Sequence, residues 1–253
     1  MSNYPEPAPY EPQRPQPVRL GLPVTKPTVT YALLAVTILA FIGQMASQSL
    51  MGTDWLTLLG VKYGPYIRNG EVWRLITPVF LHGSIYHIGF NMYALFSIGR
   101  GLESRYGHLR FAALYFLAAF SGNVLSFVLT PAASLGASTA IFGLITAEGI
   151  FLYQNRKLLG QQVYRAIGNI VLVAAINLLM GTSPGIDNWG HIGGLLGGLL
   201  FAWFGGPRWK VEGIFPLLSL TDERQGHGLW AGVAAVLVVF LPLTAIGFLF
   251  PVG

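Results

Sequence analysis

Cysteine is missing from this chain and charged residues are scarce. Without cysteine among its 253 residues, the chain can form no disulfide bonds and use no thiol catalysis. Only 10% of the residues are charged, against about 25% in an ordinary soluble domain. The net charge of +5 does not indicate nucleic-acid binding, because the lysines and arginines lie singly or in small groups between apolar blocks, where they orient membrane helices.

What the chain has in abundance is hydrophobic residues, at 53%, and they fall in seven long segments. Several approach the ~20 apolar residues that a helix needs to cross a bilayer. Helices are the open-ended segments that satisfy their own backbone hydrogen bonds in lipid. We therefore predict an all-α polytopic membrane protein with spans at 29–51, 84–101, 109–131, 138–153, 166–181, 189–205 and 229–250.

The segments between and before these spans differ in composition. Residues 1–28 hold eight of the sixteen prolines, and we expect a disordered cytoplasmic tail without a signal or transit peptide. Residues 52–83 interleave aromatic and charged side chains, a pattern typical of an interfacial loop. Residues 206–228 are expected to form a cytoplasmic loop, and 229–253 to hold the last span.

The distribution of cations predicts the orientation. With the N-terminus inside, twelve lysines and arginines lie in the inner segments and three, Lys62, Arg68 and Arg74, in the outer ones. This positive-inside bias favours seven spans, with the N-terminus cytoplasmic and the C-terminus outside, in a cell membrane. Ser138 and His191 then both lie toward the outer face.

Ser138 and His191 stand at the starts of two apolar segments. Polar groups at membrane depth are costly and therefore indicate function, although either residue alone is also typical of helix packing. Gly136 allows a tight turn before Ser138, and the first N–H groups of the following helix can stabilise an oxyanion. A serine activated by an adjacent imidazole is the general logic of nucleophilic hydrolases.

Small residues recur every four positions after His191, at Gly194, Gly198 and Ala202. This spacing predicts a face along which another helix can approach closely. The segment that carries Ser138 is one candidate for that partner.

A third polar cluster contains His82, His87 and Asn91. His87 and Asn91 are four residues apart, so on a helix they share one face. Both can donate hydrogen bonds to a developing oxyanion, and the alternative is a polar network that joins helices.

Other hydrolytic sites are disfavoured by residue type. The histidines lack a His-Glu-x-x-His pattern, so we expect no metal and no cofactor. The three aspartates, Asp54, Asp187 and Asp222, lie at expected helix ends or loops, which excludes an aspartyl pair within the membrane. Asp187 stands one turn before His191, and whether it orients the histidine or only marks a boundary stays open.

Together these residues resemble the rhomboid family of intramembrane serine proteases, over about residues 29–205. The residues that carry the resemblance are Trp73 and Arg74 in the first loop, His82, His87 and Asn91 in the second helix, Glu103 and Arg105 on the inner side, Gly136 and Ser138 in the nucleophile motif, and His191, Gly194 and Gly198 in the sixth helix.

The resemblance implies a six-helix catalytic core with one additional C-terminal helix. It implies that Ser138 is the nucleophile and His191 the base of a dyad. His87, Asn91 and the Ser138 N–H would form the oxyanion hole, with His82 and Gly136 in support. Substrates would be single-span membrane proteins cleaved near the outer face.

Two residues depart from what the resemblance implies. The family's motif usually continues Gly-x-Ser-Gly, whereas this chain has Thr139, which is bulkier and stiffer than glycine and is expected to affect substrate fit and rate. Glu148 is unusual in an apolar segment and is expected to bond a neighbour.

Two other classes of protein, an inactive relative and a transporter, fit the sequence less well than a protease. A catalytically inactive relative that binds membrane clients would typically lack the serine or the histidine, and this chain has both. A transporter would show polar residues in repeated halves. The sequence has no internal repeat, so the protease reading is favoured.

Overall fold

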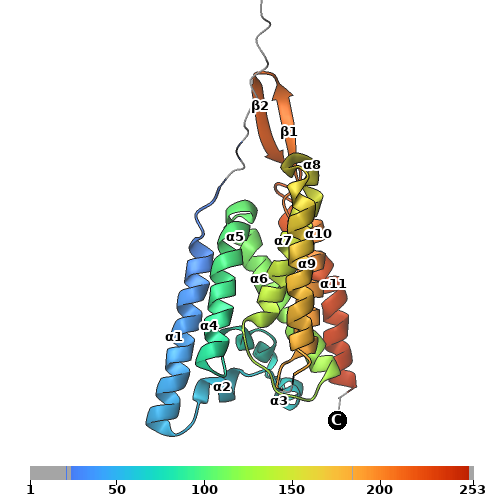
Figure 1. Cartoon of the computed structure of the whole chain (residues 1–253). Helices are drawn as coiled ribbons and strands as arrows, with labels where there is room; N and C mark the ends of the chain where they lie inside the picture. The colour runs from blue at the N-terminus through green and yellow to red at the C-terminus, as the bar shows by residue number, and fades with distance from the viewer. Residues whose placement is uncertain (1–20, 22–23, 184, 251–253) are drawn as a thin grey trace, which may run out of the picture.

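The computed structural model describes residues 21, 24–183 and 185–250 as a bundle of helices running along one common direction (Figure 1). A β-hairpin projects from one end, and the short helices α2 and α3 lie at the other (Figure 1). Of the proline-rich tail predicted for residues 1–28, residues 1–20, 22 and 23 fall outside the described residues.

Each of the seven apolar segments is helical, so the predicted helical fold is confirmed. In the described ranges α1, α6, α9 and α11 are long and apolar enough to cross a membrane, and the count of seven crossings stays a prediction. The helices are α1 (Thr28–Met51), α4 (Ile85–Ala94) continued by the π-helical η3 (Leu95–Gly99) and by α5 (Arg100–Tyr106), α6 (His108–Leu129), α7 (Ser138–Gln154), α8 (Arg156–Leu159), α9 (Gln162–Met180), α10 (Asn188–Gly205) and α11 (Gly228–Leu249).

The core forms where α10 packs against α6 and α7. Glycine makes this packing close: a side chain at Gly194 would collide with the carbonyl of Thr139, and one at Gly198 would collide with the backbone of Gly143. The partner of the small-residue face is therefore α7. Small residues allow such backbone contact, which in lipid replaces the hydrophobic driving force between helices.

Buried charges hold the helices together at the hairpin end. The fully buried carboxylate of Glu103 accepts hydrogen bonds from the N–H groups of Val29 and Thr30, at 2.8 and 2.7 Å, in the first turn of α1. It thereby satisfies N–H groups that have no partner within that helix. Arg105, two residues later, forms an ion pair with Glu148 of α7, which gives that unusual acid its partner.

Residues 52–83, the expected interfacial loop, fold back on themselves at the other end. The buried guanidinium of Arg74 donates to the carbonyls of Leu58 and Val61, both at 2.9 Å, and pairs with Glu71 at 2.6 Å. The loop contains α2 (Trp55–Gly60), α3 (Gly64–Arg68) and the 3₁₀ turns η1 (Val72–Leu75) and η2 (Thr77–Phe80).

The stretch 206–228 contains a two-stranded antiparallel hairpin that sequence analysis did not predict. Its strands are β1 (Trp209–Ile214) and β2 (Leu217–Asp222), with Trp209 opposite Asp222. Arg110 at the start of α6 pairs with Asp222 at 2.5 Å, which joins the hairpin to the bundle.

The Glu103 cap generates a prediction about stability. We expect Glu103→Ala to lower the free energy of unfolding by about 2–4 kcal/mol, because it leaves buried N–H groups without an acceptor. The measurement is thermal unfolding in detergent. Glu212→Ala is the matched control, because Glu212 is exposed and its ion pair is with the exposed Lys210 on the same strand, β1. Equal melting temperatures for the two variants would contradict the prediction.

Candidate active site

Ser138 is the first residue of α7, and the turn before it is held by Gly136. Gly136 has a φ of +133°, and a Cβ there would lie 2.8 Å from the His87 ring. Only glycine combines this backbone conformation with such close approach. Its N–H donates to the carbonyl of Pro78 at 2.9 Å. The turn therefore brings Ser138 beside the start of α4.

His191 lies in the first turn of α10, directly against Ser138. Its Nε2 is 2.9 Å from the Ser138 Oγ. The ring of Phe142, one turn along α7, stacks on the imidazole at 4.3 Å with an interplanar angle of 22°. His191 is buried, with 9% of its surface exposed. A hydroxyl and an imidazole in hydrogen-bond contact are the geometry that a serine nucleophile and its base require.

Asp187 caps α10, and its side chain is bonded to residues other than His191. Its carboxylate accepts from the N–H of Gly190 at 2.9 Å and from the hydroxyl of Ser126 on α6. Within the part of the chain that the structure describes, the Nδ1 of His191 has no hydrogen-bond partner. Ser138 and His191 therefore form a hydrogen-bonded pair, and Asp187 lies at the helix boundary.

The third polar cluster lies on and before α4, next to Gly136. The buried His82 accepts at Nε2 from the N–H of Ala137 at 3.3 Å, and its ring meets that of His87 edge to face at 5.0 Å. Asn91 is also buried, and its Nδ2 donates to the carbonyl of His87 at 2.8 Å. His82 and His87 thus reach the turn before Ser138, whereas the contact found for the Asn91 amide is with its own helix.

The other residues singled out from sequence lie away from the serine and histidine pair. Trp73 donates from its indole N–H to the carbonyl of Leu59 at 3.1 Å, within the loop of residues 52–83. Arg74 organises the same loop, and Glu103 and Arg105 join helices at the hairpin end. Gly194 and Gly198 allow the close crossing of α7 and α10.

Gln44 is a positioning residue that sequence analysis missed. Buried in α1, it accepts at Oε1 from the N–H of His82 at 3.0 Å. Its amide nitrogen donates to Asp54 at 2.9 Å and to Thr57 at 2.7 Å, so it ties both ends of the loop to α1. The available signal was a carboxamide inside an otherwise apolar segment.

Thr139 is buried between α6 and α10. Its side chain packs against Gly122 of α6 and Gly190 of α10, at 2.7 and 3.1 Å from where a Cβ would lie on those glycines. Glycine on both neighbouring helices leaves room for the extra bulk. Thr139 therefore fills the interface between α7 and its two neighbours.

Thr139→Gly is expected to lower the free energy of unfolding by about 1–3 kcal/mol, through lost packing and poorer helix propensity. The rate at which a fluorophosphonate labels Ser138 should stay within about twofold of wild type, because an unchanged approach leaves the barrier nearly unchanged. Thermal unfolding and labelling measure the two effects. Thr139→Ser, which keeps the hydroxyl and loses only the methyl, serves as control. A large gain in labelling for Thr139→Gly would show that Thr139 obstructs the site.

Comparison with known proteins gives a consistent result. The Rhomboid domain family matches residues 69–208, more than half of the chain. The chain is 42% identical over 179 residues to Rhomboid protease GluP of Bacillus subtilis, 34% over 197 residues to RHOMBOID-like protein 4 of Arabidopsis thaliana, and 34% over 175 residues to Rhomboid-like protease 3 of Toxoplasma gondii.

These matches cover 70, 74 and 68% of this chain but 34, 48 and 66% of the three relatives, so the chain spans about a third to two thirds of their length. The prediction of a helical, multi-pass membrane protein is confirmed by the family match. The chain belongs to the rhomboid family.

Proposed function

We propose that this protein is an intramembrane serine endopeptidase that cleaves single-span membrane proteins near the outer face, with Ser138 as nucleophile and His191 as base. The observation that carries the proposal is the 2.9 Å contact between His191 Nε2 and Ser138 Oγ. Its relatives include proteins named as rhomboid proteases.

The proposed reaction proceeds in two steps. Ser138 Oγ attacks the substrate carbonyl while His191 Nε2 takes its proton, and the imidazolium then donates that proton to the leaving amine. Water, deprotonated by the same nitrogen, hydrolyses the acyl-enzyme. Protonation of His191 removes the acceptor, so acidification is expected to abolish activity.

The oxyanion would be stabilised by groups on α4 and at the start of α7. The Ser138 N–H lies in the first turn of α7 and has no acceptor within that helix. The His87 ring lies beside Gly136, on the approach to Ser138. Asn91 would have to exchange its bond to the His87 carbonyl for one to the oxyanion. His82 and Gly136 hold the turn in place.

A substrate segment would reach the site between α4 and α9. Of the described side chains of α9, only Val163 is buried. The helix α9 packs mainly against α7. A hollow of about 200 Å³ separates α9 from η3 and α7, lined by Ile98, Ile145, Glu148, Asn169, Ile170 and Val173. Because α9 is held by so few contacts, displacing it should cost little free energy. This favours entry of a substrate segment sideways, from the membrane.

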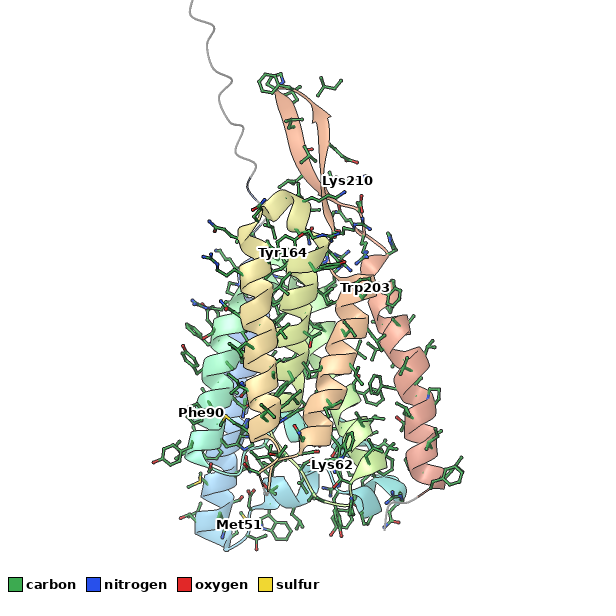
Figure 2. The ribbon with its side chains drawn as sticks, turned by 45° about the vertical axis from the view of Figure 1, so that its right-hand side comes forward. Met51, Lys62, Phe90, Tyr164, Trp203 and Lys210 are labelled. Carbon is green, nitrogen blue, oxygen red and sulfur yellow. The ribbon has the colours of Figure 1, made fainter. Side chains whose placement is uncertain are left out.

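The proposed orientation has the hairpin end in the cytoplasm and the C-terminus outside, in a cell membrane. Among the labelled residues, Lys210 and Tyr164 lie at the hairpin end, and Met51 and Lys62 lie at the opposite end (Figure 2). Of the three cations expected outside, Lys62 and Arg74 are buried in protein. The cations that face the surroundings are therefore concentrated still more strongly at the hairpin end, as the positive-inside rule requires.

Cleavage of a single-span test substrate by the purified protein in detergent checks the proposal. We expect wild type to cut it, and Ser138→Ala and His191→Ala each to reduce kcat by at least about 10³-fold, because the two residues act as a unit. Asp187→Asn serves as comparison, because the Asp187 carboxylate is bonded to Gly190 and Ser126 and not to the His191 ring, and it should lose far less activity.

Two results would contradict the proposed function. If wild type cuts no substrate and a fluorophosphonate leaves Ser138 unlabelled, the protein binds membrane clients without cleaving them. Cleavage that survives Ser138→Ala but stops with a chelator would contradict the serine mechanism.

A further inference from the structure

Lys62 is a fully buried lysine at the end of the molecule where α7 and α10 begin. It lies between α2 and α3, with 0% of its surface exposed, and Figure 2 labels it at the end opposite Lys210. Its Nζ donates to the carbonyl of Ala132 at 2.5 Å. Lysine is almost never fully buried without a partner, so this placement calls for a reason.

The segment that leads into Ser138 is bound to Lys62 by its backbone as well. Lys62 and Ser134 form an antiparallel bridge, in which each N–H donates to the other's carbonyl at 3.0 Å. Further along, Gly136 is tied to Pro78 and Ala137 to His82. The contact between the Lys62 ammonium and Ala132 is therefore the first of several that hold residues 132–137, the segment leading into Ser138.

The charge of Lys62 is opposite in sign to that of Asp187, which caps the helix that bears His191. Burial lowers the pKa of Lys62 to about 8, and the negative charge of Asp187 opposes that shift. Asp187 is hydrogen-bonded to the N–H of Gly190, in the first turn of α10. Arg74 is a second buried cation in the loop of residues 52–83. It donates to the carbonyl of Val61, the residue before Lys62, and is paired with Glu71.

We propose that Lys62 is a positioning residue for Ser138, holding the segment before α7 through its ammonium bond to the Ala132 carbonyl and its backbone bridge to Ser134. This proposal rests on the proposed serine protease function. Lys62 touches neither Ser138 nor His191, so it acts on kcat by fixing their relative position rather than by binding substrate.

As pH rises, the contribution of Lys62 to folding stability and the activity of the protein are expected to change in opposite directions. The pKa of Lys62 in the folded chain lies below that of an unfolded lysine, about 10.5, so between about pH 8 and about pH 10.5 the unfolded state binds more protons. The contribution of Lys62 to folding stability therefore rises with pH in this window. Activity should fall over the same window, because the neutral amine donates a weaker hydrogen bond to the Ala132 carbonyl than the ammonium does.

The test compares wild type, Lys62→Met and Lys62→Arg, with the exposed Lys210→Met as matched control. Methionine keeps the length of the side chain and the backbone bridge to Ser134, and it removes only the charge and the N–H donors. Cleavage of a single-span substrate and fluorophosphonate labelling of Ser138 are measured from about pH 6 to about pH 10, which covers the change in charge of Lys62.

We expect Lys62→Met to fold and to lower kcat and the labelling rate about tenfold at neutral pH, with KM unchanged. Wild type should lose activity above about pH 8, where Lys62 loses its proton, and Lys62→Met should show no such alkaline fall. Lys62→Arg, which keeps its charge at high pH, should keep its own activity above about pH 8. Lys210→Met should behave as wild type throughout.

Wild-type kcat and labelling in a folded Lys62→Met variant would overturn the proposal. So would a wild-type profile that stays flat above about pH 8, a result that needs no variant to fold. If wild type neither cleaves substrate nor reacts at Ser138, the proposed function fails and the role of Lys62 falls with it.

Discussion

The close crossing of α7 and α10 is the contact on which the rest of the structure depends. Gly194 lies against the carbonyl of Thr139, the residue after Ser138, and Gly198 lies against Gly143 one turn further along. Because both contacts are between backbones, they leave almost no freedom for the helices to slide or separate. His191 precedes Gly194 by one turn, so this crossing brings its Nε2 within 2.9 Å of Ser138.

Polar contacts at the two ends of the bundle act together with close packing to fix the arrangement of the helices. In lipid, association between helices gains little from the hydrophobic effect, so hydrogen bonds and close packing select the arrangement. At the hairpin end, Glu103 binds the first turn of α1 and Arg105 reaches Glu148 on α7. At the other end, Gln44 and Arg74 fix the loop of residues 52–83 against the bundle. Buried polar groups that are fully bonded specify a unique packing, which a uniformly apolar interface would not.

The turn before Ser138 shows how a loop is made rigid without a helix or sheet. Ser134, Gly136 and Ala137 are each bonded through the backbone to a residue in the stretch 61–83. Preorganised donors are effective in catalysis because they need not move as charge develops. The loop of residues 52–83 therefore supports the turn that leads into Ser138.

By itself, the sequence determined the helical segments, the polar residues within them and the small-residue spacing after His191, because apolar length and four-residue periodicity are local properties of the chain. Only the tertiary structure decided that α7 is the partner of α10, that Asp187 binds Ser126 and Gly190 rather than His191, and that Thr139 fits between Gly122 and Gly190. It also decided that Lys62 and Gln44 are buried and that residues 209–222 form a hairpin. These are contacts between residues distant in the chain, and their partners depend on which helices pack together, which no local pattern records.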